Sequence, residues 1–264
     1  MAAFPWLFVT DAKSRVVTID LRNDKTVSDV STGGSDGLRA DELAYDPDHG
    51  TLLVINNADT PPFGTLIDVD TSTGKLTVGK RITFSNAASG VDAQNGAEQP
   101  IWDSQTNRFY LSIPQIGSNV ANGGVIRINP FSATVEATYP VQFCGPAGLT
   151  RGPKQHGRQD ALIGCNMVFD TKGNVWDPTG TVPADPRDVI IELKSGHIDA
   201  TVFGAGAGDE VWYNSGDNNY YATGSGSPLR PLPASSAMGS TPLAVIDAKD
   251  RASVCGSCFP TGRR

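Results

Sequence analysis

The chain has 264 residues, 39% of them hydrophobic, which is enough apolar material for a sizeable core. Its formal net charge is −7 and its Lys and Arg residues do not cluster, so we do not expect it to bind duplex nucleic acid. No run approaches the roughly 20 apolar residues that span a bilayer, and the opening MAAFPWLFVTD lacks the basic region of a signal peptide. We therefore expect a soluble mature chain without a membrane span.

Short apolar segments separated by polar turns recur along the whole chain. The alternation and the β-branched residues of VVTIDL, TLLVI and VIIEL favour strands over helices. Turns such as DPDHG, DTSTGK and KSGH contain the Asp and Gly residues that hairpins need. In chain order, strands are expected within residues 7–30, 41–57, 64–82, 96–114, 123–141, 144–166, 188–203, 208–224 and 242–254.

These strands fall into repeated units of four. The period is roughly 45–65 residues with insertions, at or above the range of propeller blades. Four-stranded sheets arranged around an axis bury both faces of each sheet and leave only short edges. We predict an all-β protein whose residues 1–264 form a single β-propeller domain of five or six blades. The segment 7–30 is expected to lack the first strand of its unit.

Two stretches carry a resemblance to known propeller families. The pattern of LIDVDTSTGKLTVG resembles the YncE-like, or YVTN, repeat family. The stretch EQPIWDSQTNRFYLSIP resembles the gluconolactonase, or senescence-marker-protein-30, family, whose blades carry Glu-Gly-Pro-x-Trp-Asp, a turn and an aromatic strand. Glu98, Pro100, Trp102 and Asp103 follow that signature, and Gln99 stands where the family has Gly. In that family the Glu binds a divalent metal in the central channel, so the resemblance implies this role for Glu98.

Acidic residues recur where the first strand of a unit is expected to begin. Glu42, Glu98 and Glu210 occupy such positions, and Asp41 and Asp209 precede two of them. Carboxylates that converge in one channel repel each other unless they are solvated, paired with Lys or Arg, or neutralised by a cation. Two interpretations stay open: carboxylates that accept backbone N–H bonds at strand ends, or a site at Glu42, Glu98, Asp209 and Glu210 for one divalent cation, Ca²⁺, Mn²⁺, Mg²⁺ or Zn²⁺. Nearby residues that could add neutral oxygen ligands are Asn56, Asn57, Asn166 and Asn214.

Four cysteines allow two disulfide candidates. Cys144 and Cys165 would face each other if their segments are neighbouring antiparallel strands, and two buried free thiols are the equal alternative. Cys255 and Cys258 form a CxxC pair in a Gly- and Pro-rich tail, where a local disulfide is favoured over a catalytic role. Disulfides form in oxidising compartments, so we expect a secreted or periplasmic protein.

Two functions remain open from the sequence. One is a propeller without catalytic activity that binds a small-molecule ligand or a protein partner through its channel mouth and loops. The other is a metal-dependent lactonase or ester hydrolase with the metal in the channel. The polar insertions at 84–96 and 204–208 are expected to lead into inner strands at the channel mouth. The polar, Gly- and Pro-containing stretch 151–160 is expected to be a loop. The G-x-S-x-G match around Ser35 lies between β units, where no nucleophile elbow is expected.

Overall fold

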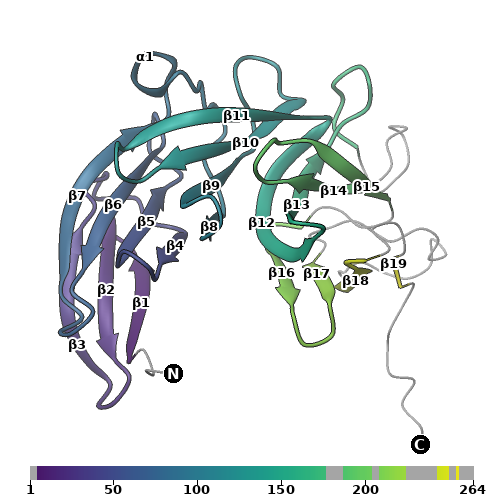
Figure 1. Ribbon diagram of the computed structural model, residues 1–264. Coiled ribbons are helices and arrows are strands. Elements are labelled where there is room, and N and C mark those ends of the chain that lie inside the picture. The colour runs from purple at the N-terminus through teal and green to yellow at the C-terminus, as the bar shows by residue number, and fades with distance from the viewer. Residues whose placement is uncertain (1–4, 177–186, 204–207, 224–242, 250–253, 256–264) are drawn as a thin grey trace, which may run out of the picture. The chain divides into compact units, whose positions relative to one another are not determined.

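The computed structural model describes residues 5–176, 187–203, 208–223, 243–249 and 254–255. Within these ranges the regular structure is β-strand, apart from the single helical turn α1 (Asn86–Ser89). The strands form five antiparallel sheets, and in each sheet the strands are ordered as they are in the chain (Figure 1). In the described part of the chain, no helix is long and apolar enough to cross a membrane. The all-β class expected from the sequence is confirmed.

The five sheets account for nineteen strands. The first sheet contains β1 (Trp6–Asp11), β2 (Arg15–Asp20) and β3 (Lys25–Ser31), and the second contains β4 (Leu43–Asp46), β5 (Thr51–Asn56), β6 (Phe63–Val69) and β7 (Leu76–Thr83). The third contains β8 (Pro100–Asp103), β9 (Arg108–Ile113), β10 (Asn122–Asn129) and β11 (Thr134–Gln142). The fourth contains β12 (Cys144–Gln155), β13 (Arg158–Val168), β14 (Arg187–Glu192) and β15 (Ile198–Phe203), and the fifth contains β16 (Val211–Asn214), β17 (Asn219–Thr223), β18 (Leu243–Asp247) and β19 (Val254–Cys255).

The chain divides into two compact units. Unit 1 comprises residues 1–118 and 126–138, and unit 2 comprises residues 119–125 and 139–264. Strands β10 and β11 pass through the division, so the third sheet contributes to both units. The expectation of a single domain over residues 1–264 stays a prediction.

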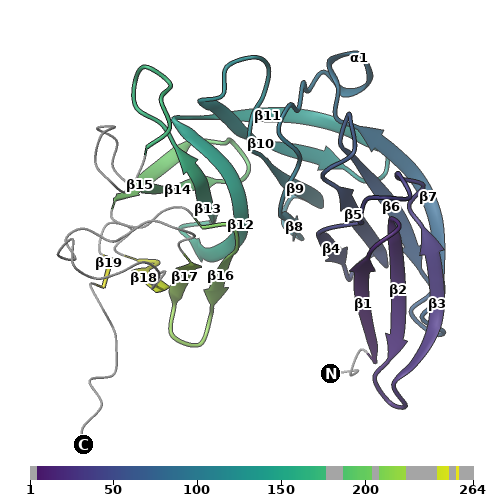
Figure 2. The ribbon, with the colours of Figure 1, turned by 180° about the vertical axis from the view of Figure 1, so that it is seen from behind.

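The first sheet has three strands, as the sequence predicted. Its β2–β3 turn begins at Asp20, whose carboxylate accepts the backbone N–H of Arg22, and the β6–β7 turn begins at Asp70, which accepts that of Ser72. The β2–β3 hairpin of the first sheet therefore corresponds to the β6–β7 hairpin of the second, and β1 corresponds to β5. Among the described residues, the strand that the first sheet lacks is the counterpart of β4. Figures 1 and 2 both show β3 beside β7 in unit 1.

The second sheet is buried on both faces, which explains the continuous apolar run of β5. Leu53 and Ile55 belong to one core cluster of unit 1, while Leu52 and Val54 belong to another. All four side chains are fully buried. Burial of an aliphatic side chain of this size contributes about 1.5–3 kcal/mol. A strand that lies between two neighbouring sheets needs apolar residues at consecutive positions, and the sequence TLLVIN supplies them.

The segment 151–160 differs from its expected form. Its polar, Gly- and Pro-containing sequence predicted a loop, but the structure extends β12 to Gln155 and begins β13 at Arg158. The two turn residues, His156 and Gly157, have φ angles of 49° and 81°. This is the backbone that a two-residue hairpin turn requires, and bulges within β12 accommodate the irregular residues before it.

Gly152 in β12 is required by the packing of unit 2. A Cβ atom at this position would lie 1.6 Å from the hydroxyl oxygen of Tyr220 in β17, a fully buried side chain. We expect Gly152→Ala to lower the free energy of unfolding by about 1–3 kcal/mol, because the core must move to admit the methyl group. Chemical denaturation measures the effect. Gly37→Ala is the control, since a Cβ atom at Gly37 would meet nothing within 4 Å, and equal stability of the two variants would contradict this account.

Candidate functional site

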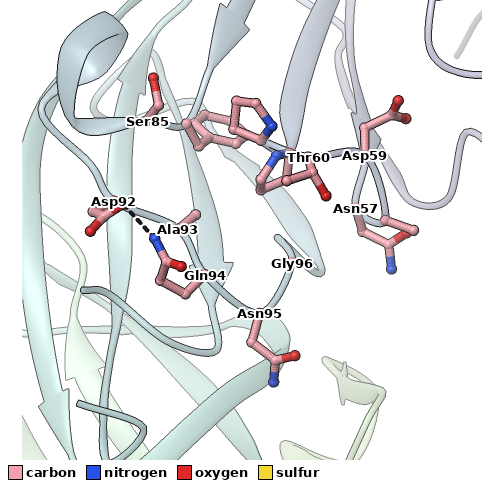
Figure 3. Close-up of a pocket in the computed structure, with 13 residues that line it drawn as sticks. Asn57, Asp59, Thr60, Ser85, Asp92, Ala93, Gln94, Asn95 and Gly96 are labelled. Carbon is pink, nitrogen blue, oxygen red and sulfur yellow. Dashed lines mark hydrogen bonds between the residues drawn. The ribbon is translucent and has the colours of Figure 1, made fainter. Parts of the chain in front are cut away.

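A pocket of about 440 Å³ lies in unit 1 between two loops (Figure 3). The first loop, 57–62, joins β5 to β6, and the second, 84–96, joins β7 to the segment before β8. Both loops leave the sheets at the end where β4 and β8 begin. The lining residues are Asn57, Ala58, Asp59, Thr60, Pro61, Pro62, Phe84, Ser85, Asp92, Ala93, Gln94, Asn95 and Gly96.

Asp59 anchors the first loop to the chain that follows β3. Its Oδ1 atom accepts hydrogen bonds from the backbone N–H and the hydroxyl of Ser35, at 3.0 and 2.7 Å. Its Oδ2 atom accepts from Nδ2 of the buried Asn56 at 3.3 Å. Ser35, the centre of the G-x-S-x-G match, therefore fixes a loop rather than forming a nucleophile elbow.

Local turn chemistry shapes the second loop. Ser85 caps α1 by accepting the backbone N–H of Ala88, and Gly90 ends the helix in the left-handed conformation with φ of 74°. Asp92 then accepts a 2.6 Å hydrogen bond from Nε2 of Gln94, drawn in Figure 3. The sequence predicted this insertion as part of a binding surface, and the structure places it against the pocket. The shorter loop 57–62 was not predicted as a pocket wall, although its NADTPP sequence is typical of a fixed turn.

Glu98 lies next to Gly96, one of the residues that line this pocket. A Cβ atom on Gly96 would be 3.1 Å from Oε1 of Glu98 and 3.4 Å from the backbone oxygen of Asn57. Gly96 also has φ of 83°, a conformation that favours glycine. Because Gly96 has no side chain, the Glu98 carboxylate lies close to the lining of the pocket.

Backbone hydrogen bonds show which acids are equivalent in unit 1. The backbone N–H of Asp41 donates to the backbone oxygen of Ile55, and the N–H of Ile55 donates to the backbone oxygen of Glu42, each at 2.8 Å. In the next sheet, the backbone N–H of Glu98 donates to the backbone oxygen of Ser112 at 2.9 Å. The N–H of Ser112 donates to the backbone oxygen of Gln99 at 3.3 Å. Asp41 is therefore the counterpart of Glu98, and Glu42 is the counterpart of Gln99. The sequence pattern had aligned Glu42 with Glu98, one residue out of register.

The same spacing in unit 2 makes Asp209, rather than Glu210, the counterpart of Glu98, because each lies two residues before its inner strand. Asp209 accepts a hydrogen bond from Nδ2 of Asn166 at 3.2 Å. In unit 1, Arg39 binds both oxygens of Asp41 at 2.7 and 3.1 Å. Among the described residues, no three side chains of His, Cys, Asp or Glu come together in a way that could hold a metal ion. The cation site at Glu42, Glu98, Asp209 and Glu210 stays a prediction.

Several other acidic residues have structural roles at hairpin turns. The carboxylate of Asp70 accepts hydrogen bonds from the hydroxyls and backbone N–H groups of Ser72 and Thr73, and these bonds lower its pKa to about 2. The carboxylate of Asp103 likewise accepts hydrogen bonds from the backbone N–H groups of Gln105 and Thr106. The DVDTSTG stretch is thus a hairpin turn, as its sequence indicates.

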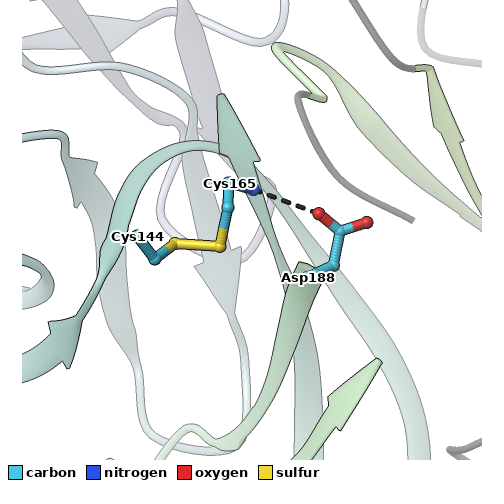
Figure 4. The surroundings of a disulfide bond; sticks show 3 residues. All are labelled: Cys144, Cys165 and Asp188. Atoms are coloured by element: carbon cyan, nitrogen blue, oxygen red, sulfur yellow. Dashed lines mark hydrogen bonds between the residues drawn. A yellow bond between two sulfur atoms is a disulfide. The ribbon is translucent and has the colours of Figure 1, made fainter. Parts of the chain in front are cut away.

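A disulfide joins Cys144 of β12 to Cys165 of β13, so this pairing is confirmed (Figure 4). Both residues are fully buried. Beside it, Asp188 of β14 is also fully buried, and its Oδ1 atom accepts the backbone N–H of Cys165 at 3.1 Å. Burial raises the pKa of Asp188 to about 7, and the hydrogen bond from Cys165 opposes this only in part. No pattern in the sequence marks Asp188, because only the packing of its sheet removes it from water.

The second cysteine pair falls largely outside the described residues. Cys258 lies beyond them, and of Cys255 the structure describes only the backbone, in β19. The insertion at 204–208 is described only at Gly208. The disulfide between Cys255 and Cys258 therefore stays a prediction, as does the role of that insertion.

Comparisons with known proteins relate this chain to others by structure. No protein-family model matches it, and no curated protein sequence matches it significantly. Among solved structures, it is similar to the Dos1 propeller, with a TM-score of 0.58 and 11% identity over 94% of this chain and 53% of that one. It is also similar to the hydrazine synthase of Kuenenia stuttgartiensis, with a TM-score of 0.65 and 14% identity over 95% of this chain and 62% of that one. The chain thus spans between half and two thirds of these structures, and its five antiparallel sheets have the β-propeller fold.

Proposed function

We propose that this protein is a binding propeller that holds a small ligand in the pocket between the loops 57–62 and 84–96. The observation that carries the proposal is the pocket itself, a cavity of about 440 Å³ built by two loops on the same end of the sheets. Its volume lies within the range of small-molecule sites. Loops positioned by a rigid β scaffold commonly carry binding functions. The buried disulfide is compatible with an extracytoplasmic location, which we propose for the protein.

Filling the pocket tests this proposal. We expect Ala58→Trp to abolish binding of small molecules found by screening the wild-type protein, because Ala58 lines the pocket and its exposed position admits a larger side chain. Ala87→Trp is the matched control, since Ala87 is also exposed but lies on α1 outside the lining. Ligand-observed NMR measures binding. If both variants retained the ligands, or if no screened molecule perturbed the pocket, the proposal would fail.

A metal-dependent hydrolase is the second candidate, favoured by the equivalent positions of Asp41 and Glu98 at the starts of β4 and β8. The described residues do not gather a set of three acidic, His or Cys ligands, so we derive no catalytic step through a metal. If a cation binds, carboxylate oxygens such as those of Glu98 would hold it, and the cation would supply Lewis-acid chemistry to an ester or lactone.

Metal analysis separates this candidate from the first. The hydrolase hypothesis expects about one equivalent of a divalent cation per chain after incubation with Ca²⁺, Mn²⁺, Mg²⁺ or Zn²⁺ and dialysis. Glu98→Gln should lose it, because an amide lacks the charge that the cation requires, and Asp36→Asn, a change at an exposed residue, should retain it. Elemental analysis measures the content, and a wild-type protein that holds no cation under these conditions would contradict the hypothesis.

A further inference from the structure

We propose that the pocket between the loops 57–62 and 84–96 takes a small organic cation, with a primary ammonium group as the recognised feature. This inference rests on the proposed binding function and adds the chemical class of the ligand. Three observations support the inference: the lining carries acidic residues, the hydrogen-bond partners of these residues are neutral, and the same cavity has apolar surface.

The charged residues of the lining are all acidic. Asp59 and Asp92 belong to it, whereas none of its thirteen residues is Lys, Arg or His. The Glu98 carboxylate lies close by, next to Gly96. An anionic ligand would enter against these charges, while an ammonium group would be attracted by them.

The hydrogen bonds of the two aspartates leave their charge in place. Asp59 accepts from Ser35 and Asn56, and Asp92 accepts from Gln94. All three donors are neutral groups, so these contacts orient the carboxylates without supplying a positive charge. Figure 3 shows Asp59 and Asp92 on different sides of the pocket. Two separated carboxylates suit an extended organic cation better than one metal ion, which needs its oxygen ligands around a single point.

The remaining lining suits the uncharged part of such a ligand. Ala58 and Pro61 are exposed apolar residues of the lining, and they give the pocket apolar surface for a short methylene chain.

Three probes of equal chain length test the ligand class: 1,5-diaminopentane, 1,5-pentanediol and glutarate. We expect the diamine to shift the amide NMR signals of residues 57–60 and 92–96 and to bind more tightly than the diol, with glutarate weakest. Binding of the diamine should weaken as salt is raised. Asp92→Asn should weaken it up to about fivefold, as expected for a partly exposed ion pair. The control, Asp48→Asn, removes the same charge in the β4–β5 turn, at the opposite end of that sheet, and should have no effect.

The outcomes separate this inference from the proposed function. If the diol or glutarate bound as tightly as the diamine and Ala58→Trp abolished that binding, the pocket would be a binding site and the ammonium assignment would be wrong. If diamine-induced shifts spread over the acidic surface and Asp92→Asn and Asp48→Asn had equal effects, the diamine would be acting as a counter-ion, which also overturns the assignment. If Ala58→Trp left the binding of every ligand unchanged, the proposed function itself would fail.

Discussion

Asp188→Asn is expected to remove most of the pH dependence of stability. In the wild-type protein, the free energy of unfolding is expected to fall by about 4 kcal/mol between about pH 4 and pH 8. The pKa of this carboxyl is raised from 3.8 to about 7 in the folded state, because the side chain is fully buried and its charged form is desolvated. Oδ2 has no hydrogen-bond partner in the described structure, so little compensates the charge when it forms.

The direction follows from the proton balance. Below about pH 4 the carboxyl is protonated in both the folded and the unfolded chain, and it does not reduce stability. As the pH rises towards 7, the unfolded chain releases the proton while the folded chain keeps it, so the free energy of unfolding falls by about 1.4 kcal/mol per pH unit. Above the folded-state pKa both states are ionised, and the loss levels off.

Denaturant unfolding from pH 4 to pH 8 measures this effect. The asparagine variant can keep the hydrogen bond from Cys165, but its buried amide N–H₂ has no partner in place, so we expect it to be about 1–3 kcal/mol less stable than the wild-type protein at pH 4. The informative quantity is therefore the slope with pH, which should be nearly flat in the variant. Asp36→Asn, at an exposed site, should keep the wild-type slope. Parallel profiles for Asp188→Asn and the wild-type protein would show that Asp188 ionises normally.

Removal of the Cys144–Cys165 disulfide is expected to lower the free energy of unfolding by about 3 kcal/mol. The bond closes a loop across a sequence separation of 21, and a cross-link of that span restricts the unfolded chain by about this amount. Because both cysteines are fully buried, replacing them with Ala adds a smaller loss from the missing sulfur atoms. The measurement is denaturant unfolding of Cys144→Ala/Cys165→Ala beside the oxidised wild-type protein.

A reductant provides the internal check. Reduced wild-type protein should approach the stability of Cys144→Ala/Cys165→Ala, and the reductant should have little effect on that variant. A second variant, Cys255→Ser/Cys258→Ser, isolates any contribution of the CxxC pair and should retain the full response to reduction. If the first variant were as stable as the oxidised wild-type protein, the proposed contribution of the bond would be refuted.

The exact register of the inner strands could not be predicted from the sequence. The pattern at Glu98 correctly predicted a strand, a turn and an aromatic strand. It did not show that Asp41, rather than Glu42, is the counterpart of Glu98, because both are acidic and stand at the same junction. Only the backbone hydrogen bonds to Ile55 and Ser112 separate the two positions. A shift of one residue reverses the face on which a side chain lies.

The two loops that form the pocket could be predicted only one at a time. The polar composition of 84–96 indicated a surface insertion, and this is what the structure contains. The loop 57–62 is short and 30 or more residues distant from Asp92 in the chain, so no local pattern connects it with that insertion. Residues 151–160 looked equally loop-like, yet they continue a hairpin, because the positive φ angles of His156 and Gly157 allow a two-residue turn.

The local structure of this protein can be predicted from its sequence: apolar alternation specifies the strands, and Asp, Asn and Gly specify the hairpin turns. These are interactions between residues a few positions apart, so they can be deduced from the chain alone. The pairing of Cys144 with Cys165, the burial of Asp188 and the position of two loops at one pocket are set by tertiary packing. Each of these depends on which sheets and loops pack together, and the free energy of that packing is shared among residues far apart in the sequence.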